Sequence, residues 1–347
     1  MHNFKNDYTV GAHPEVLNML SETNLIPQLG YGDDDYSIAA KETIKQKLNR
    51  PEAKVFFLSG GTQTNLIVIS FLLRIHEAVI SAKTGHIAAN ETGAIEATGH
   101  KVITVETADG KLKPSDVNLV LKDYSLQPHV VKPRIVFISN STEIGTIYNT
   151  KELTELSEFC KSKNLLLYLD GARLGHGITA ENSDLSLATI AQLTDVFYIG
   201  GTKNGALLGE ALVFNDQELA TEFEFALKQK GAMLAKSRIL AIQFLALFKN
   251  DLYFTLAKHA NKMAMKIAHV INESGYSFLT NSTTNQIFPI LPNNIIDELG
   301  SKYLFYVWKE IDENHSAIRL ITSWATEEYI VDELINDIKK HKKAGKQ

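Results

Sequence analysis

The sequence predicts an α/β fold built on a mostly parallel sheet with helices on both faces. Between about residues 50 and 214, short runs rich in apolar β-branched and aromatic residues alternate with helix-like segments. The runs are continuously apolar, as expected for strands of a parallel sheet that crossover helices cover on both faces. We expect strands at residues 55–59, 78–82, 101–106, 134–139, 165–170, 196–200 and 211–214.

One of the intervening helices has a clear start. Asn149 or Thr150 can cap it, and Glu152 places a negative charge in its first turn. Leu153 and Leu156 follow at helical spacing, so they lie on one apolar stripe. We therefore expect a helix at this point that packs its apolar stripe against the sheet.

The pattern changes after residue 214, where long helical segments replace the alternation. Apolar residues keep helical spacing from Leu256 to Ile271, and Gly275 ends the run. A last helix opens at Thr326. Before it come three strand-like runs, at residues 277–280, 286–292 and 317–324. We expect an N-terminal arm that reaches the active site or the small domain, a large α/β domain, and a small C-terminal α+β domain, at residues 1–30, 31–254 and 255–347.

Composition and charge exclude several kinds of partner. The 35 basic and 40 acidic side chains give a formal net charge of −5, so we expect no nucleic acid partner. The longest apolar run, residues 66–73, is shorter than the roughly 20 residues that span a bilayer, so we expect no membrane partner. The start of the sequence lacks the apolar core of a secretory signal, and the single cysteine, Cys160, cannot form an internal disulfide bond. Both features favour the cytoplasm.

Ligands of open α/β sheets bind outside the carboxyl ends of the strands, so the residues that follow each strand are the candidates for ligand binding. Gly60, Gly61 and Thr62 come between an expected strand and an apolar helix. Glycine lets the backbone approach an anion, and the helix start supplies free N–H groups. The run is neither a Walker loop nor GxGxxG, which argues against a nucleotide. A phosphate cup is one interpretation, and a simple glycine turn before a helix is the other.

Three further side chains follow strands at the same edge. Asp170 ends one strand, Lys203 follows the next between glycines, and His86 lies at a strand-to-helix turn. A lone histidine there is often only a structural hydrogen bonder. Together with the phosphate cup, however, these residues supply what pyridoxal 5′-phosphate requires. They offer a carboxylate for the pyridine nitrogen, a ring to stack on it, and a lysine for a Schiff base.

In this order the motifs SGGTQTN, TGHI with Glu91, LDGARL, GGTKNG and RLITSW resemble the threonine aldolase and β-eliminating lyase branch of the pyridoxal phosphate enzymes of fold type I. The resemblance covers nearly the whole chain and implies the transferase-like fold of these pyridoxal phosphate-dependent enzymes. It implies that Lys203 binds the cofactor aldehyde, Asp170 pairs with the pyridine nitrogen, and His86 stacks on the ring. It also implies that the phosphate binds at Gly60, Gly61 and Thr62, that Arg173 belongs to the cofactor site, and that relatives form homodimers or homotetramers.

The resemblance further implies a site for the substrate carboxylate. Arg173 and Arg319 would grip the α-carboxylate, a task suited to the guanidinium fork, with Asn6 contributing from the N-terminal segment. His86, directly or through water, would accept the proton of the β-hydroxyl group.

The chain departs from the family pattern at three positions. Asn6 stands where the relatives have serine, and Glu143 ends a stretch that replaces their Asn-Thr-His-Asn. Leu234 replaces an arginine expected to contact phosphate. Lys228 or Lys230, from the same chain or a neighbour, is a candidate replacement.

We expect a pyridoxal phosphate-dependent lyase that cleaves the Cα–Cβ bond of a β-hydroxy-α-amino acid to glycine and an aldehyde, without a metal ion. Threonine and allo-threonine are the candidate substrates. Two alternatives use the same fold: a lyase that catalyses β-elimination, and a catalytically silent scaffold. A nicotinamide-binding protein would also alternate strands and helices, but it should carry GxGxxG after its first strand.

Overall fold

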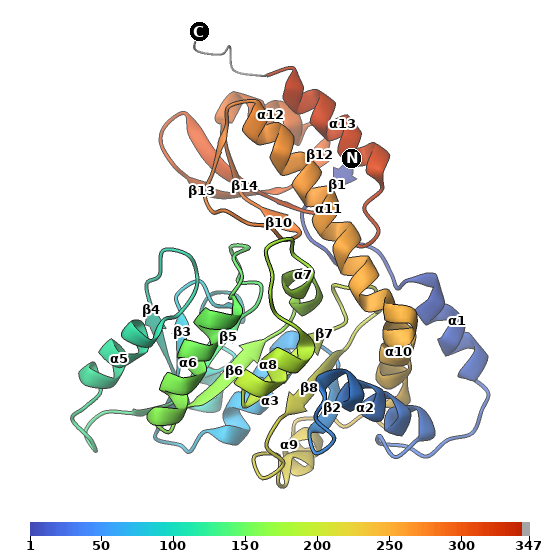
Figure 1. Ribbon diagram of the computed structural model, residues 1–347, viewed down its shortest axis with the longest axis vertical. Coiled ribbons are helices and arrows are strands. Elements are labelled where there is room, and N and C mark those ends of the chain that lie inside the picture. The colour runs from blue at the N-terminus through green and yellow to red at the C-terminus, as the bar shows by residue number, and fades with distance from the viewer. Residues whose placement is uncertain (342–347) are drawn as a thin grey trace.

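The computed structural model describes residues 1–341, and its main body is a seven-stranded sheet between two layers of helices (Figure 1). The expected mostly parallel α/β fold is confirmed. Strand order is β2-β8-β7-β6-β5-β3-β4, with β8 antiparallel to both its neighbours and the other pairs parallel. The strands are β2 (Lys54–Leu58), β3 (Glu77–Ala82), β4 (Lys101–Val105), β5 (Lys132–Ser139), β6 (Leu166–Asp170), β7 (Val196–Gly200) and β8 (Glu210–Phe214).

Side chains of these strands alternate between two apolar cores, one on each face of the sheet. In β7, Phe197 and Ile199 belong to one core, whereas Val196 and Tyr198 belong to the other. Burial on both faces explains why the strand sequences are continuously apolar.

Helices of the main body connect the strands or cover the sheet. They are α1 (Pro14–Thr23), α2 (Asp35–Leu48), α3 (Gly61–Leu72), α4 (His86–Ala89), α5 (Pro114–Asp123), α6 (Thr150–Ser162), α7 (Leu174–Ile178), α8 (Leu187–Leu193), α9 (Phe223–Gln229) and α10 (Arg238–Phe248), with a short 3₁₀ turn at Glu96–Thr98. The expected helix start at α6 is confirmed. Asn149 is its cap, because its side chain accepts the N–H of Glu152 (2.8 Å) while the Glu152 carboxylate accepts the N–H of Asn149 (3.0 Å).

The C-terminal part has its own antiparallel sheet and its own apolar core, and α11 (Leu252–Glu273) leads into it (Figure 1). Strands β9 (Ser277–Phe278), β10 (Gln286–Ile287), β11 (Pro289–Pro292) and β14 (His315–Ile321) fall in or beside the expected runs. Three elements were not expected: α12 (Asn293–Gly300), β12 (Tyr303–Leu304) and β13 (Tyr306–Glu310). β13 escaped prediction because it is a largely exposed edge strand with a mixed sequence.

The last helix begins slightly later than the sequence predicts. α13 spans Glu328–Lys339, and the Thr326 hydroxyl instead accepts the N–H of Ser323 (2.8 Å) in the preceding turn. The end of the expected helix and of the expected small domain, residues 342–347, lies outside the described residues.

The N-terminal arm contacts both parts of the molecule. β1 (His2–Asn3) pairs with β12, and Phe4 is buried in the C-terminal core. Further along, α1 packs against α10 of the main body. Residues between these contacts therefore pass the junction of the two parts. The exact boundaries of the arm and the two domains stay predictions.

One helical stretch is longer and more apolar overall than the run at residues 66–73 suggested. α10, the 3₁₀ turn Lys249–Asp251 and α11 together are long and apolar enough to cross a membrane by length and composition alone. More than half of the most apolar part of this stretch is buried inside the fold. Core helices of soluble proteins can have the same length and composition. The backbone also turns left-handed at Asn250 and Asp251, which divides the stretch into two helices.

Candidate active site

Two adjoining cavities lie at the carboxyl ends of the parallel strands. The glycine-lined cavity, of about 290 Å³, is bordered by Gly60, Gly61 and Asp170. The arginine-lined cavity, of about 450 Å³, is bordered by Arg173 and Arg319. Three residues border both cavities: Tyr8, His86 and Lys203. The structure thus brings together all the predicted site residues except Asn6.

The glycine-lined cavity has an anion cup at the N-terminus of α3. Gly60 caps this helix, and the first N–H groups of a helix have no partner within it. A side chain at Gly61 would come within 2.9 Å of the Tyr198 hydroxyl, so only glycine leaves the cup open. The Thr62 side chain borders the same cavity.

Asp170 lies buried in this cavity and is held by neutral donors. Its carboxylate accepts hydrogen bonds from the Tyr198 hydroxyl, the Ala172 N–H (3.0 Å) and the Asn65 amide (3.1 Å). Within residues 1–341 these three neutral donors are the groups that hydrogen-bond to this buried charge. The carboxylate therefore stays available for a cationic group of a ligand. Gly171 next to it has to be glycine, because a Cβ would lie 1.7 Å from the Tyr198 carbonyl oxygen.

A buried chain of hydrogen bonds connects Asp170 with His86. Asn65 donates to both Asp170 and Glu91 (2.8 Å), and the Tyr168 hydroxyl donates to the Asn65 amide oxygen (2.8 Å). Glu91 in turn lies 2.9 Å from Nδ1 of His86. Asn65 ends the SGGTQTN motif, but nothing in the sequence indicates this role.

Lys203 borders both cavities from the turn after β7. Burial and the positive charge of Arg173 lower the pKa of its ammonium group, which favours a nucleophilic amine. Glu210 lies close by, where it accepts hydrogen bonds from the Gly201 N–H (3.1 Å) and the Thr202 hydroxyl (2.9 Å). Burial raises the pKa of Glu210 to about 8, and this residue was not predicted.

Arg173 is held by a residue of the N-terminal arm. Its Nε and Nη2 atoms donate to the two carboxylate oxygens of Asp7, at 2.7 and 3.0 Å. Asn285 donates to the same carboxylate (2.9 Å). Burial alone would raise the pKa of Asp7, but the charges of Arg173 and Lys203 outweigh it and hold that pKa well below its usual range. Arg173 keeps its third nitrogen, Nη1, free of hydrogen bonds to any described residue.

Arg319 projects from β14 between two aromatic rings. Its guanidinium carbon lies 5.0 Å from the ring centre of Tyr306 and 4.8 Å from that of Trp308. Nε is buried and has no partner within residues 1–341. Burial lowers the pKa of Arg319, and the charge of Arg173 adds to this effect. Two guanidinium groups with free nitrogens in one cavity form a site for an anion.

Some sequence predictions lie elsewhere in the structure. Asn6 accepts the Tyr8 N–H (3.1 Å) and borders neither cavity, whereas Tyr8 borders both and Asp7 binds Arg173. Lys228 lies over the ring of Tyr31 (4.3 Å) instead of in the cup. Leu234 packs against the main core, and the exposed Lys230 borders neither cavity.

The chain matches the Beta-eliminating lyase family over residues 16–293. It belongs to this family. It is 32% identical over 341 residues to the low specificity L-threonine aldolase of Pseudomonas aeruginosa, covering 97% of this chain and 96% of that protein. It is 26% identical to the low specificity L-threonine aldolase of Escherichia coli, over 74% of this chain and 75% of that protein.

Solved structures agree with this assignment. The threonine aldolase of Leishmania major superposes with a TM-score of 0.96 at 44% identity, covering 98% of this chain and 99% of that one. An aspartate aminotransferase of Thermus thermophilus superposes with a TM-score of 0.71 at 12% identity, covering 98% of this chain and 91% of that one, which shows the shared fold. The chain is a lyase of a family that depends on pyridoxal 5′-phosphate.

The residues of the glycine-lined cavity fit this cofactor. The cup at Gly60, Gly61 and Thr62 suits its phosphate, and Asp170, whose hydrogen-bond donors among residues 1–341 are neutral, suits a protonated pyridine nitrogen. Lys203 opens onto the same cavity.

The Asp7–Arg173 pair generates a prediction about stability and pH. Asp7→Asn leaves Arg173 buried without its counter-ion, so we expect the unfolding free energy at pH 7 to fall by about 3 to 5 kcal/mol. The folded-state pKa of Asp7 is depressed, so its contribution is complete above the pKa of an unfolded aspartate, about 3.9, and is lost as the pH falls through the folded-state value. Urea unfolding measured from pH 7 down to about 3 should therefore show a constant gap between variant and original protein that begins to narrow below about pH 4.

A matched control is Asp312→Asn, which removes an exposed carboxylate paired with His315 at the surface. We expect this change to leave the unfolding free energy nearly unchanged at pH 7. An Asp7→Asn variant as stable as the control would contradict the account of the ion pair.

Proposed function

We propose that this chain cleaves the Cα–Cβ bond of a β-hydroxy-α-amino acid, such as threonine or allo-threonine, to give glycine and an aldehyde. The observation that carries the proposal is the convergence of Arg173 and Arg319 on a cavity that also contains Lys203. Two guanidinium groups suit a substrate whose α-carboxylate stays in place while another bond at Cα breaks. The similarity to low specificity L-threonine aldolases supports this reaction.

Bound pyridoxal phosphate would supply an electron sink for the pair that remains on Cα. Lys203 would hold the cofactor aldehyde, and Asp170 would keep the pyridine nitrogen protonated. The N–H groups at Gly60 and Gly61, with the Thr62 hydroxyl, would bind the phosphate. The ring of His86 would cover one face of the cofactor.

The arginines would orient the amino acid. Arg319 offers its buried Nε, which has no partner in the part of the chain that the structure describes, and Arg173 offers Nη1 while Asp7 fixes the rest of its guanidinium group. Because the carboxylate is gripped at two points, the orientation of the other bonds at Cα is set, and with it the bond that breaks.

We expect the protein loaded with cofactor to release glycine and acetaldehyde from threonine or allo-threonine. Arg319→Ala should raise KM by about 10- to 100-fold with an unchanged visible spectrum of the bound cofactor, because it removes one partner of a desolvated charge pair. Lys309→Ala, on the exposed edge strand next to Arg319, is the control and should keep the original KM.

Other outcomes would indicate a different reaction, no reaction, or a different role for Arg319. A 2-oxo acid and ammonia from a β-substituted amino acid, without glycine from threonine, would show β-elimination. A bound cofactor with no turnover of any amino acid would show a catalytically silent protein. An unchanged KM in Arg319→Ala would mean that Arg319 does not grip the carboxylate.

We also propose that the chain forms a homodimer or homotetramer. The segment that includes Leu25, Leu29 and Tyr31 exposes apolar side chains, with Leu25 90% exposed. It lies beside the stretch in which Leu234 replaces the expected arginine, since the Tyr31 N–H donates to the Ala235 carbonyl oxygen (3.2 Å). A second copy packed on this segment would cover it and could complete the phosphate site.

Light scattering at micromolar concentration should give a multiple of the 38.6 kDa chain mass. Leu25→Asp should lower that mass and weaken cofactor binding with it, because it places a charge in the proposed interface. Leu126→Asp, at a similarly exposed leucine between α5 and β5, should do neither. A single-chain mass with full activity would contradict the proposal.

We further propose a cytoplasmic location, which the single cysteine supports. Cys160 is a buried free thiol, and burial raises its pKa to about 12, so it is unsuited to disulfide formation. Recovery of the native protein outside the cytoplasm on cell fractionation would contradict this location.

A further inference from the structure

Glu143 is the charged residue of the arginine-lined cavity that has no role in the reaction so far. The cavity is bordered by three cations, Arg173, Arg319 and Lys203, and Glu143 is the carboxylate among the described residues that border it. The arginines serve the α-carboxylate and Lys203 serves the cofactor. An acid in the remaining part of the cavity would repel a carboxylate and would not suit an alkyl group, but it suits a hydroxyl group, which can donate a hydrogen bond to it.

The Glu143 side chain is anchored by one of its two oxygens. Oε1 accepts hydrogen bonds from the Ser139 hydroxyl (2.7 Å) and from the backbone N–H of His86 (3.0 Å). Within residues 1–341, no other residue donates a hydrogen bond to Oε2. One oxygen therefore fixes the carboxylate, and the other is available to a ligand in the cavity.

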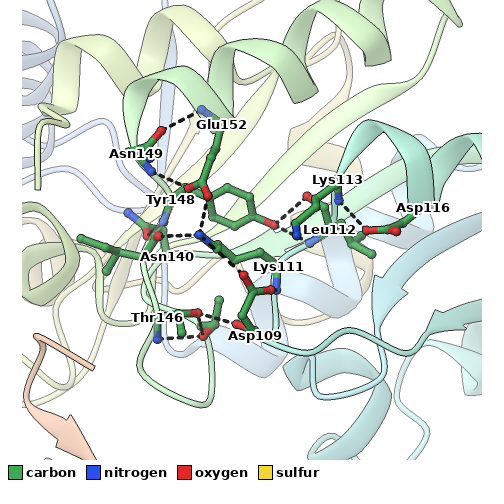
Figure 2. Close-up of polar contacts among 12 residues, drawn as sticks. Asp109, Lys111, Leu112, Lys113, Asp116, Asn140, Thr146, Tyr148, Asn149 and Glu152 are labelled. Carbon is green, nitrogen blue, oxygen red and sulfur yellow. Dashed lines mark hydrogen bonds and ion pairs between the residues drawn. The ribbon is translucent and has the colours of Figure 1, made fainter. Parts of the chain in front are cut away.

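The loop that carries Glu143 is fixed on both sides of it. Before it, the Asn140 N–H donates to the Asp170 carbonyl oxygen (3.1 Å), and the Asn140 side chain accepts the Tyr148 N–H (3.1 Å). After it, the Thr146 hydroxyl donates to the Asp109 carbonyl oxygen (2.6 Å). Figure 2 shows the contact of Thr146 with Asp109, which belongs to the segment before α5.

Two further contacts join the residues after the loop to the segment before α5 (Figure 2). The buried Tyr148 hydroxyl accepts the Leu112 N–H (2.7 Å), and Lys111 pairs with Glu152 (2.6 Å). A loop held at so many points presents Glu143 in one position, as a group that takes part in proton transfer requires.

The surroundings of Glu143 raise the pKa of its carboxyl group. Burial raises its pKa, and the negative charge of Asp170 raises it further, while the Ser139 hydroxyl, the backbone N–H of Glu143 itself and His86 act in the opposite direction. Arg173 and Lys203 also border its cavity. A carboxyl with a pKa above the ordinary range is a better proton acceptor than a free glutamate.

We propose that Glu143 accepts the proton of the substrate β-hydroxyl group directly. This inference rests on the proposed function. The O–H bond breaks and its proton moves to Glu143, the O–H electron pair forms the aldehyde C=O bond, and the Cα–Cβ bond breaks with its pair remaining on Cα. One proton is then taken up at Cα to give glycine, so proton and electron counts balance without a further reactant.

His86 is the competing acceptor, since it also borders the cavity. Its Nδ1 atom already contacts Glu91 at 2.9 Å, and its backbone N–H anchors Glu143. We therefore assign His86 to covering the cofactor and to holding the carboxylate that takes the proton.

The test separates proton acceptance from the other steps by using two reactions of the loaded enzyme. The first is cleavage of threonine, and the second is exchange of the glycine α-proton in D₂O, followed by NMR. Glycine has no β-hydroxyl group, so its exchange needs the cofactor site but not Glu143.

The key variant is Glu143→Gln, which keeps an oxygen for Ser139 and the His86 N–H but cannot accept a proton. Glu106→Gln, at an exposed carboxylate paired with Lys83, is the control.

Glu143→Gln should lower kcat for threonine by about 100-fold or more, as expected for the loss of a general base. Glycine exchange and the cofactor spectrum should stay close to those of the original protein, and Glu106→Gln should change nothing. Unchanged cleavage in Glu143→Gln would overturn the proposal. Equal loss of cleavage and exchange would also overturn it, because Glu143 would then act only by holding the loop.

His86→Phe keeps a ring over the cofactor but removes both nitrogens. Selective loss of cleavage in His86→Phe, with cleavage retained in Glu143→Gln, would make His86 the acceptor. A failure of the proposed function has a different signature. The original protein would then exchange glycine without cleaving any β-hydroxy amino acid.

Discussion

The buried ion pair between Asp7 and Arg173 is the interaction on which the site depends. Asp7 belongs to the N-terminal arm, Arg173 follows β6 of the large sheet, and Asn285, which also binds Asp7, belongs to the C-terminal part. A buried carboxylate is stable only when its partners are in place. The pair therefore ties three distant segments together at the cavity and fixes the guanidinium group that would grip the substrate.

The neighbouring carboxylate, Asp170, is stabilised in a different way. Its donors are an amide, a hydroxyl and a backbone N–H, none of which carries a charge. It can therefore lie inside the protein and still attract a cationic ring nitrogen. The Asn65 amide also donates to Glu91, and Glu91 contacts His86. Asp170 and His86 therefore belong to one hydrogen-bonded network. This edge of the sheet thus combines a carboxylate held by neutral donors, Asp170, with an arginine held by an ion pair, Arg173.

The strands of the large sheet could be predicted from the sequence, because burial on both faces makes each strand a continuously apolar run. The sequence also predicted that Gly60, Asp170 and Lys203 lie close together, because the carboxyl ends of parallel strands meet at one edge of the sheet. It could not identify Asp7, since its role comes from pairing with Arg173, far away in the chain. Glu210 was also missed, although the residues that donate to it, Gly201 and Thr202, are close to it in the chain. β13, with Tyr306, was missed because an exposed edge strand needs no apolar pattern. Glu143 was visible only as a departure from the family pattern, and its anchored and free oxygens required the structure.

The central claim is that the edge of the sheet holds pyridoxal phosphate on Lys203, and covalent trapping tests it most directly. The protein is mixed with the cofactor, reduced with borohydride, digested and mapped by mass spectrometry. The account predicts one modified peptide, which contains Lys203, and no modification in Lys203→Ala. A cofactor adduct on another lysine, or no adduct in the original protein, would contradict the claim.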